Sequence, residues 1–136
     1  MPRSFPDSGV LIDAARTERT ERGVMAVKYL GDPARSYLTS PLVRLETVPK
    51  ASYNRRSAEL EFYEDFFGDS RLEWCRDWER METIAYEQAR RYGLGAVDAF
   101  HIAAAYLLGP DELVTTEKPQ KPMYRSELVR VICLYV

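Results

Sequence analysis

Segments with β-strand character alternate with helical segments along the whole chain. The expected strands are 3–7, 36–40, 71–75, 112–116 and 128–135, and the expected helices are 10–15, 23–30, 42–48, 54–67, 78–92 and 96–108. This alternation predicts an α/β fold, a three-layer sandwich in which helices flank a mainly parallel central sheet. We expect an edge position for the strand at 71–75, and burial along much of the strand at 128–135.

Prolines mark several of the expected boundaries. Pro6 lies in the first strand and removes a ladder donor, so it predicts a strand end or an edge strand. Pro41 suits the first position of a helix with Ser40 as the N-cap. Pro49 lacks the N–H that a helix interior needs, so we expect that helix to end there.

Length and composition fit one folded domain spanning residues 1–136. The formal net charge of −2 gives no broad attraction to nucleic acid, so an RNA partner would need a local basic patch or metal ions. Cys75 and Cys133 fit no metal or redox spacing, which predicts free thiols and a cytoplasmic protein. No apolar run is long enough for a membrane span, and the N-terminus lacks a signal-peptide core.

The segment Tyr92–Tyr106 joins a buried helix to a single acid. Gly93 and Gly95 interrupt the preceding helix, and an apolar helix begins immediately after them. Asp98 then falls in the first turn, where the helix dipole favours a carboxylate. A run of three alanines follows, which predicts close packing of this helix against another element.

Three further acids have similar settings. Asp7 and Glu117 stand at the carboxyl ends of expected strands, and Glu46 and Asp98 stand in the first or second turn of helices. Ligands of parallel sheets bind beyond the carboxyl ends of the strands. Four acids on one rim would suit a hard divalent cation, Mg²⁺ or Mn²⁺.

Each of these residues also has a purely structural interpretation. Asp7 could be a turn or cap residue, and Asp98 a partner of the helix dipole. Glu117 could face solvent in a loop, and Glu46 could be a polar residue on an apolar helix face. His101, one turn after Asp98, is more often a packed or hydrogen-bonded core residue than a metal ligand. The joint arrangement of the acids is what favours a functional site.

The order of the motifs resembles that of PIN domains, in particular the small VapC-type toxins of bacterial toxin–antitoxin pairs. The motifs are DSGVLI from Asp7, SPLVRLE ending at Glu46, DAFHIAAA from Asp98, and VTTE ending at Glu117. By this resemblance Asp7, Glu46 and Asp98 match the three most invariant acids of the family, Glu117 matches the fourth, and Thr115 matches the threonine of its Thr-x-Asp motif. The chain departs from the pattern at Pro6, at Gly9, where a polar residue is usual, and at Glu117, where Asp is usual.

The resemblance implies an endoribonuclease that hydrolyses RNA with a metal-activated water and no covalent intermediate. It implies primary ligation by Asp7 and Asp98, with Glu46 and Glu117 acting through water or orienting the nucleophile. Residues expected to support the ligands are Ser8 and Thr115, and residues expected to contact phosphates are Arg44, Lys118, Lys121 and Arg125.

Other interpretations stay open. The chain could be a non-catalytic PIN-like module that binds a protein or dimerises through the aromatic helix 54–67, where Phe62, Tyr63, Phe66 and Phe67 form a stripe typical of a core or a dimer surface. A homodimer is the expected oligomer, and an antitoxin could hold the nuclease inactive. An aspartyl-phosphate phosphatase is disfavoured because Gly9 occupies the place of its second Asp.

Overall fold

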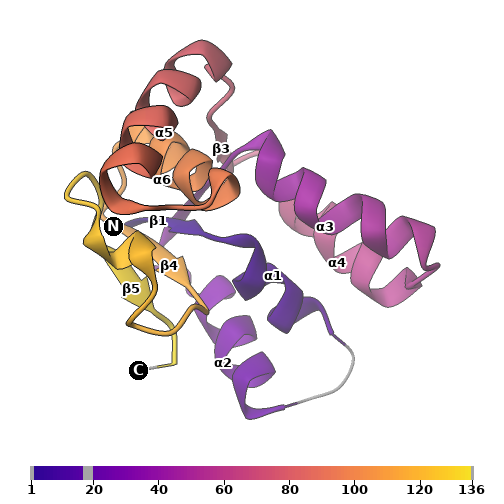
Figure 1. Ribbon diagram of the computed structural model, residues 1–136. Coiled ribbons are helices and arrows are strands. Elements are labelled where there is room, and N and C mark those ends of the chain that lie inside the picture. Colours follow the sequence, from indigo (N-terminus) through magenta and orange to yellow (C-terminus); the bar gives the residue numbers. More distant parts are fainter. Residues whose placement is uncertain (1, 17–19, 136) are drawn as a thin grey trace.

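Five strands form one sheet, and every pair of neighbours in it is parallel. The computed structural model describes residues 2–16 and 20–135 of the chain, and the strand order is β3-β2-β1-β4-β5 (Figure 1). The elements are β1 (Arg3–Pro6), α1 (Ser8–Ala15), α2 (Glu21–Leu30), β2 (Ser36–Thr39), α3 (Pro41–Tyr53), α4 (Ser57–Phe67), β3 (Glu73–Trp74), α5 (Trp78–Tyr92), α6 (Ala96–Leu108), β4 (Glu112–Thr115), the 3₁₀ helix η1 (Pro122–Arg125) and β5 (Val131–Cys133). The expected α/β architecture with a parallel sheet is confirmed.

The central strand β1 carries the first acid out of the sheet. Pro6 is the last residue of this strand, so the expectation of a strand end is confirmed although β1 is not an edge strand. Asp7 continues the ladder by one bond, because its N–H donates to the Val114 carbonyl at 2.9 Å. The chain then turns directly into α1.

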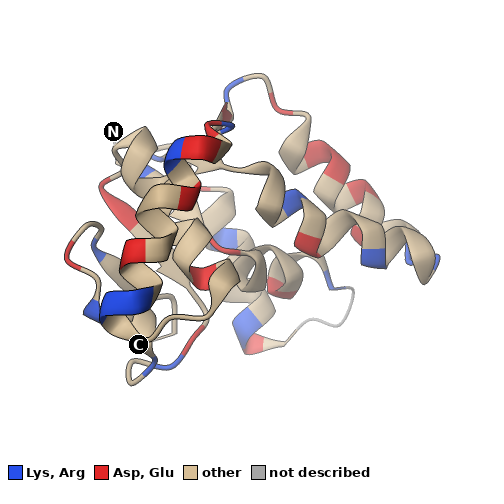
Figure 2. Ribbon diagram, turned by 45° about the horizontal axis from the view of Figure 1, so that its top comes forward, with Lys and Arg blue, Asp and Glu red and all other residues tan. Residues whose placement is uncertain are grey.

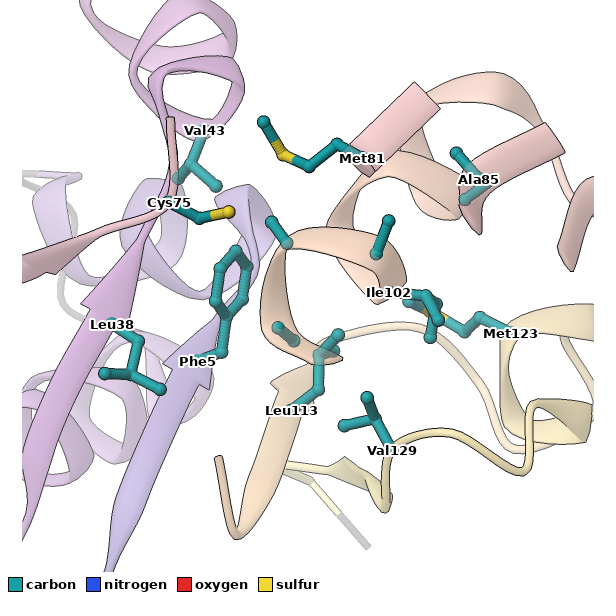
Figure 3. Close-up of a cluster of buried hydrophobic side chains, with 14 of the residues drawn as sticks. Phe5, Leu38, Val43, Cys75, Met81, Ala85, Ile102, Leu113, Met123 and Val129 are labelled. Carbon is teal, nitrogen blue, oxygen red and sulfur yellow. The ribbon is translucent and has the colours of Figure 1, made fainter. Parts of the chain in front are cut away.

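Successive side chains along the strands pack on opposite faces of the sheet. Phe5 and Leu113 belong to the same buried cluster as Ile102 of α6 and Met81 of α5 (Figure 3). The next residue of β4, Val114, packs instead with residues of α1 and α2. This period of two is what a strand buried on both faces requires, because successive side chains point to opposite sides. The helix pairs α5–α6 and α1–α2 therefore cover opposite faces, and α3 with α4 extends to one side (Figure 1).

Several expected bounds differ from the structure by one to three residues, as at the starts of α1, α2 and α4, and two differences have a structural explanation. The helix expected to end at Pro49 continues to Tyr53 with that proline inside it. Its buried residues Val43, Thr47 and Ala51 recur every four positions, so packing of this face outweighs the missing hydrogen bond. The last strand is only β5 and is partly exposed throughout, because it lies at the edge of the sheet. The connection from β4 to β5 contains η1.

The aromatic stripe of α4 is used inside the molecule. Tyr63 is buried, and Phe62, Phe66 and Phe67 are partly buried against the core. Of the two interpretations of this stripe, the structure therefore supports the core, and a homodimer stays a prediction without it. The edge position of β3 is confirmed. Of the expected loop or helix start at 17–22, residues 17–19 lie outside the described residues.

Candidate functional site

Asp7 is the N-cap of α1 at the carboxyl end of the central strand. Its Oδ1 accepts a hydrogen bond from the Val10 N–H at 3.4 Å, and its Oδ2 accepts one from the Thr115 hydroxyl at 2.5 Å. The Asp7 side chain is buried, and this burial raises its pKa to about 6 although the bond from Thr115 acts in the opposite direction. Asp7 is therefore a carboxylate held in place at a considerable electrostatic cost.

Thr115 connects the first acid to the last. Its hydroxyl donates to Asp7 and accepts a hydrogen bond from the backbone N–H of Glu117 at 3.1 Å. The residue is fully buried at the end of β4, the strand beside β1. The spacing of Thr115 and Glu117 thus fixes the start of the following loop against the Asp7 carboxylate.

Asp98 lies in the first turn of α6, as expected from the sequence. Burial raises the pKa of Asp98, the negative charges of Glu117 and Glu46 raise it further, and His101 and Lys121 act in the opposite direction. Asp98 in turn adds to the raised pKa of Asp7. The four acids therefore form one electrostatically coupled cluster drawn from β1, α3, α6 and the loop after β4.

Glu46, in the second turn of α3, is tied to two other elements. Its Oε1 lies within hydrogen-bonding distance of Nε2 of His101, at 2.7 Å, and the Ser8 hydroxyl of α1 is near enough to this carboxylate to lower its pKa. Burial favours the protonated acid, but His101 and Ser8 outweigh it and lower the pKa of Glu46. The supporting role expected of Ser8 stays a prediction.

His101 was not among the expected site residues. It is buried and hydrogen-bonded, as the structural interpretation of a lone histidine predicts, but its partner is Glu46. Its position one turn after Asp98 was the only sequence indication that it faces the acids. The pairing with Glu46, which is 55 residues away, could not be read from the sequence.

The four expected phosphate-binding residues are all exposed. Lys121 is near enough to Asp98 to affect its pKa. Lys118 lies on the same connection, and Arg125 donates to the Tyr92 carbonyl at 3.3 Å. Arg44 lies on α3, two residues before Glu46. Lys and Arg are interspersed with Asp and Glu along the ribbon in Figure 2, so any attraction of phosphates would be local. Their contact with phosphates stays a prediction.

The departure at Gly9 has a packing explanation. A Cβ atom built at this position would lie 2.4 Å from Oγ1 of Thr116 and 3.4 Å from Oδ1 of Asp7. The first turn of α1 thus approaches the end of β4 too closely for a side chain. Glycine at position 9 leaves room for the Thr116 hydroxyl beside α1.

The chemistry of the cluster fits a hard divalent cation, because its acids offer only oxygen donors and burial of like charges favours neutralisation by a cation. Within residues 2–16 and 20–135, no three Asp, Glu, His or Cys side chains are already arranged to hold an ion. Ligation by Asp7, Glu46, Asp98 and Glu117 would therefore require side-chain rearrangement. The assignment of these four ligands stays a proposal.

The family model of the PIN domain matches residues 4–121, and the chain belongs to this family. PIN domains are typically nucleases and generally bind divalent metals. A comparison with curated proteins gave no match. In the part of the chain that is described, no helix is both long enough and apolar enough to cross a bilayer.

Solved structures from three bacteria, one of them a toxin–antitoxin complex, share the fold. The VapBC2 complex of Rickettsia felis, bound to a DNA fragment from its promoter, matches with a TM-score of 0.67 at 16% identity and covers 96% of this chain and 98% of that chain. A toxin–antitoxin complex from Klebsiella pneumoniae matches with a TM-score of 0.70 at 19% identity, covering 97% and 98%. FitAcB from Neisseria gonorrhoeae matches with a TM-score of 0.66 at 14% identity, covering 97% and 98%. The likeness extends over nearly the whole length of each chain and establishes the fold.

Proposed function

We propose that this PIN domain is a metal-dependent endoribonuclease that hydrolyses RNA phosphodiester bonds. The observation that carries the proposal is the coupled acid cluster of Asp7, Glu46, Asp98 and Glu117 at the carboxyl end of a parallel sheet. Ligand sites of parallel sheets lie at this end. Membership of a family that typically comprises nucleases supports the same reaction class.

The acids would divide the work by the length of their side chains. Asp7 and Asp98 would be the primary ligands of Mg²⁺ or Mn²⁺, and Glu46 and Glu117, whose side chains are longer, would bind through water or orient the nucleophile. When bound, the ion would supply an activated water and would stabilise negative charge on the phosphodiester oxygens. Thr115 donates a hydrogen bond to Oδ2 of Asp7, and Ser8 would support Glu46, whose pKa it lowers.

Basic residues around the cluster would hold the RNA backbone. Lys121 is the best placed of them, because its charge reaches Asp98. Lys118 and Arg125 share its exposed connection, and Arg44 approaches from α3. Because the net charge is −2, binding would depend on these local contacts and would weaken with added salt.

We also propose that the protein is the toxin of a toxin–antitoxin pair, with an antitoxin protein as its partner. The fold shared with the three solved structures, one of them a toxin–antitoxin complex, supports this proposal. Copurification of a protein encoded next to this chain, with loss of RNA cleavage in the complex, is the expected result. Free and complexed protein that cleave RNA equally fast would contradict it.

Cleavage of a mixed pool of structured RNA in Mg²⁺, Mn²⁺ or EDTA tests the nuclease. We expect metal-dependent internal cleavage by the parent and none by Asp7→Asn. Asp65→Asn, on the exposed face of α4, is the matched control and should cleave like the parent. Cleavage that survives EDTA or the Asp7 substitution would exclude this mechanism.

Metal-dependent stability separates the nuclease from a PIN-like module that only binds a protein. The nuclease predicts that Mn²⁺ raises the thermal midpoint of the parent, because a ligand of the folded state stabilises it, and that Asp98→Asn abolishes the rise. A binding module predicts midpoints that are insensitive to Mn²⁺ in both proteins.

A further inference from the structure

We propose that His101 is a positioning residue, which orients the carboxylate of Glu46 toward the metal without itself binding the metal. The inference rests on the proposed nuclease function and deepens it. It assigns a role to the chain's single histidine, which lies one turn after Asp98 on α6.

The contact joins a fixed group to a mobile one. The His101 side chain is 2% exposed, whereas the Glu46 side chain is 31% exposed, and the distance from Nε2 to Oε1 is 2.7 Å. The imidazole packs against the Phe5 ring, with 6.1 Å between the ring centroids. Ala99 and Ile102, its neighbours on α6, are also buried. A partly exposed glutamate on a helix would otherwise sample several rotamers. The buried histidine therefore selects one position for Oε1.

The surroundings of Nδ1, the other ring nitrogen of His101, indicate which nitrogen carries the hydrogen. Nδ1 of His101 is buried and, among the described residues, has no hydrogen-bond partner. A hydrogen on Nδ1 would be a buried donor without an acceptor, which is costly. The geometry therefore points to the tautomer whose hydrogen is on Nε2 and is donated to Glu46. The same bond occupies Nε2, so this nitrogen is not available as a metal ligand.

A second donor completes the arrangement. The Ser8 hydroxyl on α1 is near enough to Glu46 to lower its pKa, so a donor on a second element faces the same carboxylate. Carboxylates that bind metals are often oriented by such hydrogen bonds, and their loss typically reduces metal affinity or activity by about 10–100-fold. We assign this function to His101 because its donor is the buried one.

The first experiment observes the bond without metal or RNA. Full-length protein labelled with ¹⁵N at histidine gives signals from one imidazole only. We expect the Nε2–H tautomer and slow exchange of this hydrogen, and faster exchange in Glu46→Ala, which removes the acceptor. Glu61→Ala, exposed on α4, is the control and should leave the exchange unchanged. An Nδ1–H tautomer, or an exchange rate that Glu46→Ala does not alter, would overturn the proposal.

The second experiment measures Mn²⁺ affinity by calorimetry and, separately, kcat and KM for RNA. We expect His101→Leu to lower Mn²⁺ affinity or kcat by about 10–100-fold with little change in KM. His101→Gln, whose amide N–H can replace Nε2–H, should restore most of the loss. In a Glu46→Ala background, His101→Leu should have no further effect.

The two proposals fail in different ways. A folded His101→Leu variant that keeps the parent's Mn²⁺ affinity and kcat would overturn the positioning role, as would an undiminished effect of this change in the Glu46→Ala background. If the parent binds Mn²⁺ and shows the Nε2–H bond but cuts no RNA, the nuclease proposal is wrong and the orientation of Glu46 by His101 stands.

Discussion

At the scale of single residues, burial makes the carboxylates of Asp7 and Asp98 less stable than they would be in water, and this favours the binding of a cation. Asp7 is buried with its pKa raised to about 6, and Asp98 is raised by burial and by its acidic neighbours. A shift of one pKa unit corresponds to about 1.4 kcal/mol. Burial of the ionised Asp7 and Asp98 therefore lowers the stability of the metal-free fold, and neutralisation of their charge removes this cost.

Asp7→Asn should stabilise the metal-free protein at neutral pH. The folded-state pKa of Asp7 is about 6 and its ordinary value is 3.8, so the folded state binds the extra proton. Stability of the parent therefore falls as pH rises from about 4 to about 6 and then levels off. At pH 8 we expect the variant to gain up to about 3 kcal/mol in urea unfolding with EDTA, and little at pH 4. Asp65→Asn should show no such pH dependence, and an equal gain at both pH values would contradict the burial argument.

Gly9→Ala should destabilise the fold through one contact. Its Cβ would meet Oγ1 of Thr116 at 2.4 Å, so the threonine or α1 must move. Overpacking of this kind costs about 1–3 kcal/mol, partly offset by the better helix propensity of alanine. Thr116→Ala removes the clashing atom, so the double variant should regain most of the loss in a urea titration. Additive losses in the double variant would locate the cost elsewhere.

At the scale of elements, α3 shows packing overriding local chemistry. Pro49 lies inside the helix, where it gives no N–H, yet the helix continues to Tyr53. The face formed by Val43, Thr47 and Ala51 is buried along the whole helix, and this burial maintains it. The continuity matters for the site, because α3 carries Glu46.

Pro49→Ala should stabilise α3. The substitution restores a backbone donor and removes the clash of the proline ring, and proline in a helix interior costs about 3 kcal/mol. Because the fold has adapted to this proline, we expect a gain of about 1–3 kcal/mol by urea unfolding. Lys50→Ala, the exposed neighbour in the same helix, should change stability by only a few tenths of a kcal/mol. A loss of stability in Pro49→Ala would show that the ring makes contacts of its own.

At the scale of the whole molecule, the end of the chain closes onto its beginning. The Tyr135 hydroxyl donates to Oδ2 of Asp13 at 2.6 Å, and the Arg22 guanidinium lies 4.2 Å from the centroid of the Tyr135 ring. Burial, together with the bond to Asp13, raises the pKa of this tyrosine. The last strand is short and pairs with only one neighbour, β4, because it lies at the edge of the sheet. The contacts of Tyr135 therefore help to hold it in place.

Tyr135→Phe should lower the stability of the fold and weaken the attachment of the last strand. The change removes a partly buried bond to a carboxylate, which typically contributes about 1.5–3 kcal/mol, and we expect a loss near the lower end. The Leu134 amide, which donates to the Thr115 carbonyl at 2.9 Å, should exchange faster. Tyr86→Phe alters a mostly exposed ring and should change neither quantity. An unchanged exchange rate of the Leu134 amide would show that β5 does not depend on the bond from Tyr135 to Asp13.

The elements whose ends carry their own local chemistry could be predicted from the sequence. The helices at 78–92 and 96–108 were predicted with the observed bounds. Gly93 supplies the left-handed residue after the first of them, with φ of 71°, and Asp77 caps its start through the Arg80 N–H. Alternation of strand and helix then sufficed for a parallel sheet, which places acids that follow strands at one edge.

The tertiary structure alone decided which side chains meet. Pairing of His101 with Glu46 and of Thr115 with Asp7 joins residues 55 and 108 positions apart, and no local pattern encodes such contacts. The passage of α3 through Pro49 likewise depends on a face buried by other elements. Local backbone preferences determined the elements and their order, whereas the contacts that shape the acid cluster depend on packing across the sheet, because burial and hydrogen bonding act between distant segments.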